Sequence, residues 1–134
     1  MSYAAANAVQ AAVYGALIGD VALAALVGGA IHDAEPDAPP DLYVALGPER
    51  VREASDASGR GAEHRITVSV VTSRSGFSAA KAAAGRVEAV LHGADLALDE
   101  GRLVDLAFVE ARARRDRRDR TRRVDMVFRA RTDG

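Results

Sequence analysis

The chain has 134 residues, a formal net charge of −1 and no cysteine. This length is typical of one domain with one hydrophobic core, so we expect a single domain over residues 1–134. The lack of cysteine excludes disulfides and thiol chemistry, and the lack of tryptophan disfavours a deep aromatic ligand pocket. All but one of the 18 basic residues are arginine, a skew typical of a GC-rich genome.

The charges are distributed unevenly along the chain. Residues 1–61 carry eight acids and three arginines, and the remainder is net basic. A polar molecule of this kind can stack against copies or partners of opposite sign.

The first 19 residues carry no charge, yet they do not predict a membrane span. Asn7 and Gln10 make the stretch only weakly apolar, and Asp20 ends it. No basic segment precedes it, so a signal peptide is not expected either, and we expect a soluble intracellular domain. Residues 3–18 instead have the periodicity of an amphipathic helix, and Asp20 is placed to cap a short second helix over residues 21–27.

The middle of the chain predicts strands and one further helix. Residues 42–46 are apolar on both faces, which indicates an inner strand that ends at Gly47 and Pro48. Residues 49–62 form either a strand pair with a flexible tip or a long mobile loop. Residues 63–73 alternate as a strand does, and residues 77–92 repeat apolar side chains at helical spacing.

The last quarter predicts a long hairpin. Two alternating apolar runs, residues 103–109 and 124–131, flank an arginine-rich segment at residues 112–123, which we expect to be the hairpin tip. Strands interrupted by helices indicate an α+β fold, an antiparallel sheet packed against two main helices.

No motif predicts catalysis or metal binding. The three histidines lack zinc-ligand spacing, and neither a nucleophile elbow nor a phosphate-binding loop is present. The glycines of residues 58–61 indicate a flexible turn. We therefore expect no catalytic residue, no metal and no cofactor.

The arginine-rich segment is the candidate functional feature, and three interpretations of it stay open. It can contact phosphates of nucleic acid, it can form ion pairs with a neighbouring subunit, or it can be a solvated hairpin end that prevents edge aggregation. Two interleaved aspartates and the lack of interleaved aromatic residues weigh against nucleic acid. The candidate interaction surface comprises the arginines of this segment and three from residues 49–62: Arg112, Arg114, Arg115, Arg117, Arg118, Arg120, Arg122, Arg123, Arg50, Arg52 and Arg60.

The order of these elements resembles a known family. An alanine-rich helix is followed by Ile31-His32-Asp33 with a nearby Pro36, by the run Tyr43-Val44-Ala45-Leu46-Gly47, by a strand and a helix, and by a closing Arg129-Ala130-Arg131-Thr132. This pattern is similar to the tail-terminator, or tail-completion, proteins of long-tailed bacteriophages, especially those of alphaproteobacterial gene transfer agents. The resemblance covers essentially the whole chain.

The resemblance implies a structural role in a particle. Such proteins have a small α+β fold and form a hexameric ring on the tail tube, which ends tube polymerisation and joins the tail to the head-completion (stopper) protein. Double-stranded DNA passes through the lumen without sequence-specific binding. The implied partners are further copies of the chain, the major tail tube protein and the stopper. The implied location is the head–tail junction of a particle assembled in the bacterial cytoplasm, with no enzymatic activity and no membrane. The alternative is a small nucleic-acid-binding domain that uses residues 112–123.

Overall fold

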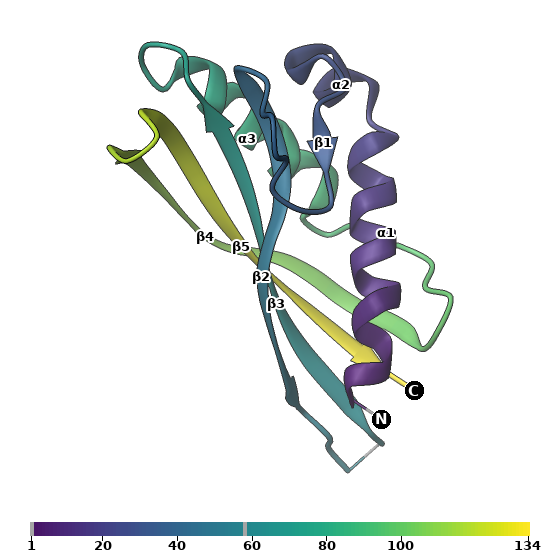
Figure 1. The fold of residues 1–134 in the computed structure, drawn as a ribbon. Helices are drawn as coiled ribbons and strands as arrows, with labels where there is room; N and C mark the ends of the chain where they lie inside the picture. Colours follow the sequence, from purple (N-terminus) through teal and green to yellow (C-terminus); the bar gives the residue numbers. More distant parts are fainter. Residues whose placement is uncertain (1, 58) are drawn as a thin grey trace.

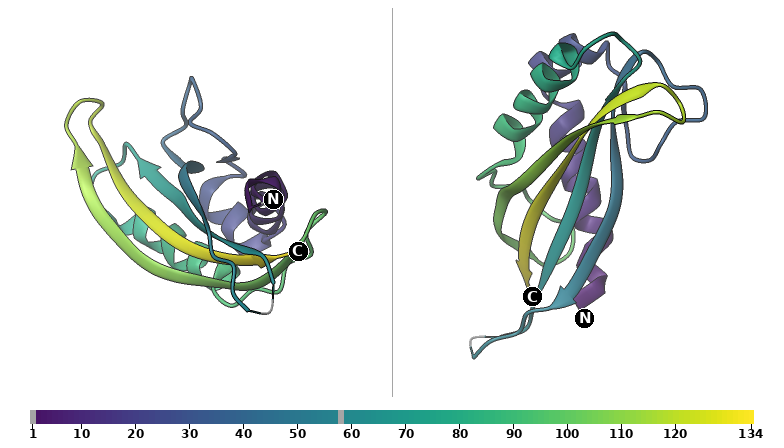
Figure 2. Two further views of the ribbon diagram at one scale, coloured as in Figure 1. Left: turned by 90° about the horizontal axis from the view of Figure 1, so that it is seen from below. Right: turned by 90° about the vertical axis from the view of Figure 1, so that its left-hand side faces the viewer.

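The computed structural model describes residues 2–57 and 59–134, and it has an α+β fold. One sheet carries helices on one of its faces (Figures 1 and 2). The other face, which we call the open face, is covered only in part, where Ala30 packs against Tyr43, Ala45 and Val71. The elements are η1 (Ser2–Ala5), α1 (Ala6–Ile18), α2 (Val21–Val27), β1 (Ile31–His32), β2 (Leu42–Glu53), β3 (Gly61–Thr72), α3 (Ser78–Leu91), β4 (Arg102–Asp116) and β5 (Thr121–Asp133).

The expected α+β class is confirmed, but the sheet is mixed rather than wholly antiparallel. Its strand order is β1-β2-β3-β5-β4. The pairs β2–β3, β3–β5 and β4–β5 are antiparallel, whereas the two-residue β1 runs parallel to β2. Residues 33–41 carry the chain back to the end of the sheet at which β1 begins. β2 therefore runs in the same direction as β1, and the two strands pair in parallel.

The strand predicted to end at Gly47 and Pro48 continues to Glu53. A register shift between Leu46 and Glu49 carries β2 past these two residues. Proline lacks an N–H donor but is tolerated at a bulge on a sheet edge, and β1 covers only Val44 and Ala45 of this strand. Of the two alternatives for residues 49–62, the strand pair is therefore the correct one. Residues 54–60 connect the strands, and Ser58 lies outside the described residues.

The arginine-rich segment is not a tip, as predicted, but mostly strand. β4 extends to Asp116 and β5 begins at Thr121, so only residues 117–120 form the turn, which we call the tip. In the half of the hairpin near the tip, apolar and polar side chains alternate only weakly. This half extends beyond the helices, so neither of its faces is covered by them. Sequence periodicity therefore underestimated the length of both strands.

The predicted core faces are confirmed. Residues Val124, Met126, Phe128 and Ala130 of β5 are buried with Val68 and Val70 of β3 in one cluster that also includes the inner face of α3. Phe128 is fully buried and packs edge to face against Phe108, with 5.7 Å between the two ring centroids.

Asp20 caps α2 as expected and also ties it to α3. Its carboxylate accepts a hydrogen bond from the Leu23 N–H at 2.9 Å and two from the Arg86 guanidinium at 2.8 Å each. These bonds, the two from Arg86 above all, lower the pKa of Asp20 from 3.8 to about 2.

Within the described residues, no single helix has the length and apolarity needed to cross a membrane. Tyr3–Ile18 and Val21–Val27, which meet at a bend of 76°, satisfy the length and composition criteria only as a pair.

His64 is an unusual member of the sheet because it is fully buried on the helix-covered face. Its Nε2 lies 3.0 Å from Thr132 Oγ1, and its Nδ1 has no hydrogen-bond partner in the described residues. Burial lowers the pKa of His64, against the opposing effect of the Glu49 carboxylate.

We therefore expect the free energy of unfolding to fall as the pH is lowered through about 6.5, because the unfolded chain then binds a proton that the folded chain does not. The dependence is at most ~1.4 kcal/mol per pH unit for one group. Urea denaturation of the wild type and of His64→Gln at pH values from about 7.5 to 5.5 measures it, that being the range in which histidine titrates. His92→Gln, which changes an exposed histidine, is the control. The same pH dependence in His64→Gln and the wild type would contradict this assignment.

Candidate interaction surface

The hairpin β4–β5 distributes its arginines over two faces and the tip. Arg112 and Arg114 pair in register with Asp125 and Arg123, so they lie on the open face of the sheet. Arg115 pairs with Arg122 and so faces the helix side. Since strand side chains alternate between faces, one run of arginines becomes several separate groups.

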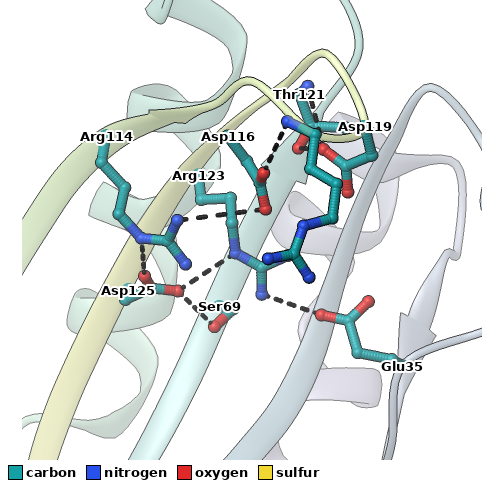
Figure 3. A network of polar contacts seen from close by, with 9 residues as sticks. Glu35, Ser69, Arg114, Asp116, Asp119, Thr121, Arg123 and Asp125 are labelled. Carbon is teal, nitrogen blue, oxygen red and sulfur yellow. Dashed lines mark hydrogen bonds and ion pairs between the residues drawn. The ribbon is translucent and has the colours of Figure 1, made fainter.

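An ion-pair network attaches the part of the hairpin next to the tip to the rest of the sheet (Figure 3). Asp125 accepts hydrogen bonds from Ser69 Oγ at 2.7 Å and from Arg114 Nε at 3.1 Å, and it lies 3.5 Å from Arg123 Nε. Burial by itself raises the pKa of Asp125, but the bonds from Ser69 and Arg114 and the nearby guanidinium charges outweigh it, so the net shift is downward. The carboxylate therefore remains ionised between two arginines.

Arg123 extends this network to the loop between β1 and β2. Its Nη2 donates to Glu35 Oε1 at 2.8 Å, and the other oxygen of Glu35 accepts from the Tyr43 hydroxyl at 2.7 Å. Burial, together with this hydrogen bond, raises the pKa of Tyr43 to about 12. The contact holds residues 33–41 at the same end of the sheet as the tip.

Arg122 anchors the hairpin on the helix side. Its Nη1 donates to the Arg74 carbonyl at 3.2 Å, and its guanidinium lies 5.8 Å from the centre of the Phe77 ring. Lys81 lies over the same ring at 5.6 Å. The start of β5 is thus attached to the segment that leads into α3.

The tip is held in one conformation by its two aspartates. Asp116 accepts from the Arg118 N–H at 3.1 Å, and Asp119 accepts from the N–H and hydroxyl of Thr121. Arg120 has a φ of 61°, a left-handed conformation uncommon for a residue other than glycine. The aspartates that interrupt the arginine-rich segment therefore shape the turn.

The eleven candidate arginines fall into two classes. Those with a partner inside the chain are Arg52, which lies 3.7 Å from Glu63, and the three described above, Arg114, Arg122 and Arg123. Across residues 2–57 and 59–134, the side chains of the others form no hydrogen bond or ion pair, and all seven are exposed: Arg50, Arg60, Arg112, Arg115, Arg117, Arg118 and Arg120. Five of these seven lie in the half of the hairpin near the tip, where Arg112 is on the open face, Arg115 is on the helix side and the other three are in the tip, and Arg50 and Arg60 lie elsewhere.

Sequence reasoning missed the acidic half of this surface. Asp125 was detectable, because it occupies a polar position in the alternation of β5. Glu35 gave no such signal, since it lies in a loop 88 residues before its partner Arg123.

Nothing in the described residues forms a metal site, as no group of three or more histidines, cysteines or carboxylates is suitably arranged there. The surface offers exposed cations and ordered ion pairs, which suit contact with a macromolecule.

The fold is that of a known class of virion proteins. A family model, that of the tail completion protein gp17, matches residues 11–133, and the chain belongs to this family. No curated protein matches the chain.

One solved structure gives a more particular relationship. A chain of the virion of a native gene transfer agent particle is 54% identical, with a TM-score of 0.92, and the match covers 99% of this chain and 100% of that one. The expected resemblance is confirmed: this is a tail-completion protein of the gene transfer agent type, a structural component of a virion tail.

We expect the Glu35–Arg123 contact to contribute measurably to stability, because the Arg123 side chain is only 14% exposed. A double-mutant cycle with Glu35→Gln and Arg123→Gln, read by urea denaturation, should give a coupling energy of about 0.5–1 kcal/mol. The control cycle uses Arg102→Gln and Asp133→Asn, a pair at 3.0 Å whose side chains are 70% and 44% exposed, and it should give close to zero. Equal couplings in the two cycles would contradict a larger contribution from the Glu35–Arg123 contact.

Proposed function

We propose that this protein, acting as one unit over residues 1–134, forms a ring that ends the tail tube and joins the tail to the head-completion (stopper) protein, with DNA passing through the lumen. The observation that carries the proposal is membership of the tail-completion family together with the full-length match to a chain of a gene transfer agent virion. A hexamer is the stoichiometry we propose.

The arrangement of the two hairpins supports an adaptor of this kind. Gly61 pairs with Asp133 and Thr72 pairs with Arg122, so the β2–β3 turn and the β4–β5 tip lie at opposite ends of the sheet (Figure 1). A subunit between two structures needs a projection toward each of them. We propose that one hairpin contacts the tail tube, and that the other contacts the stopper or a neighbouring subunit.

Ring closure requires two different patches on each subunit, since a cyclic assembly with more than two members is built from heterologous contacts. The exposed arginines of the hairpin end are a candidate for one patch.

A second candidate function, a nucleic-acid-binding module, rests on the same arginines. Arg112, Arg115, Arg117, Arg118 and Arg120 have no internal carboxylate partner among the described residues, so their charges are available for phosphates. The role as an assembly protein is favoured, because the family match points to a tail and the two aspartates of this segment reduce its net charge.

For the ring, we expect a density map of the particle to place this chain in one six-fold ring at the head–tail joint. Cells that lack the protein should produce tubes of uncontrolled length and heads without attached tails, because nothing ends polymerisation or joins the two parts. Complementation with the wild-type chain is the control. Density for this chain at any other position would rule the proposal out.

For the alternative, binding to duplex DNA should weaken with salt, and the triple variant Arg115→Ala, Arg117→Ala, Arg118→Ala should reduce the slope of log affinity against log salt by about 3. Arg114→Ala is the matched control, because that guanidinium already pairs with Asp125 and should leave the slope nearly unchanged. Fluorescence anisotropy from low to moderate salt measures both. Absence of binding at low salt would remove this function.

A further inference from the structure

Six of the eight acids in residues 1–61 are unsuited to be the complement of the basic tip, and the other two, Glu49 and Glu53, accept hydrogen bonds from Tyr3 and Ser55. Four of the six are paired within the chain, since Asp20 contacts Arg86, Glu35 contacts Arg123, Asp41 contacts Arg74 and Asp56 contacts Arg131. The 33–41 loop, which also carries Asp33 and Asp37, is held at the tip's own end of the sheet by Glu35. The acids of residues 1–41 are therefore either paired with an arginine of the same chain or located at the same end of the sheet as the tip, where a head-to-tail contact cannot use them.

A second acidic patch lies in the linker between α3 and β4, residues 92–101. This segment contains Asp95, Asp99 and Glu100, all exposed, and it contains no lysine or arginine. Glu100 lines a small hollow together with Arg60. Asp95 and Asp99 form no ion pair or hydrogen bond within the described part of the chain.

The linker is held in a defined conformation. The Gly93 N–H donates to the Leu106 carbonyl at 2.7 Å, and the Phe108 N–H donates to His92 Nδ1 at 3.0 Å. Leu96 and Leu98 pack against the core, whereas Asp95 and Asp99 on either side of them are exposed. The acids are thus presented on an ordered surface, which lowers the entropy lost when a partner binds.

The topology keeps this patch far from the tip of the same chain. The linker ends where β4 begins at Arg102, and the tip follows where β4 ends at Asp116. The linker begins beside Phe108 in the middle of β4, so at least eight residues of extended strand, about 26 Å, separate it from Asp116, and the two surfaces cannot meet within one subunit. Figure 1 and the left view of Figure 2 both place them on opposite sides of the molecule.

We propose that the basic tip, which carries Arg117, Arg118 and Arg120 and is flanked by Arg115, docks on the Asp95–Asp99 patch of the next copy of this chain. This contact rests on the ring of the proposed function and specifies its two patches. Each surface carries exposed charges of one predominant sign, each is ordered by its own chain, and the two lie at opposite ends of one strand, as a heterologous contact requires. Exposed ion pairs are individually weak, so the contact fixes the register between neighbours and is sensitive to salt.

Cross-linking in assembled particles tests the contact directly, because the chain has no cysteine of its own. The double variant Arg118→Cys, Asp99→Cys, treated with a short bis-maleimide, should give a ladder of covalent multimers, while either single variant should remain monomeric. The matched control, Glu88→Cys with Asp99→Cys, retains the acceptor and moves the other thiol to the exposed face of α3, away from the hairpin, and it should give no ladder.

A charge swap gives an independent readout. Arg117→Glu with Arg118→Glu should reduce the yield of completed particles on the order of tenfold, and adding Asp95→Arg and Asp99→Arg should restore most of it. The control charge reversal on α3, Glu88→Arg, lies outside both surfaces and should leave the yield unchanged. Thermal melting of each purified variant verifies that it folds.

The outcomes separate the contact from the ring. A six-fold ring in the density map, with no ladder from Arg118→Cys, Asp99→Cys and no rescue by the charge swap, would overturn the contact and leave the proposed function standing. The absence of a ring would remove both. Binding of the tip to DNA, with no ladder, would assign the arginines to the alternative function.

Discussion

The antiparallel pairing of β3 with β5 is the constraint on which the rest of the structure depends. It joins Gly61–Thr72 to the last strand over twelve residue pairs and so connects the hairpin of the first half to the hairpin of the second. Because side chains alternate along both strands, this one register places Val68, Val70, Met126 and Phe128 under the helices and places Arg123 and Asp125 on the open face. A shift of one residue would exchange the two faces completely.

On the open face, several charged side chains form ion pairs that stabilise the fold. Asp125, placed between Arg114 and Arg123, and Glu35, placed between Arg123 and Tyr43, fix the hairpin to its neighbours. The arginines so engaged are not available to a partner, and those left free collect near residues 117–120. The arginine-rich segment of the sequence therefore gives a small, exposed, positively charged tip, and the arginines Arg114 and Arg123 in the strands next to it are paired with carboxylates. Such a tip suits a contact that selects register and partner more than one that maximises affinity.

Membership of the tail-completion family suggests why the two hairpins lie at opposite ends of the sheet. A chain that completes a tail has to meet neighbours on more than one side, and this sheet ends in a different hairpin at each extremity (Figure 1). The long strands separate these ends, and the helices pack on one face of the sheet between them. Our proposed contact between the tip and the Asp95–Asp99 patch uses the same separation, because a surface that cannot fold back on its own acceptor has to find it on another copy.

The sequence alone determined the fold class, the helices, the core faces, the Asp20 cap and the family, because each depends on local periodicity or on the order of elements along the chain. It did not determine that β2 continues past Pro48, that β1 pairs in parallel, or that the arginine-rich segment is strand up to Asp116. Only the tertiary structure decided which arginines are free, since their partners depend on strand register and on a loop residue, Glu35, 88 positions away from Arg123. Pairing of charges is a property of positions in space, and the order of residues along a chain does not encode it locally.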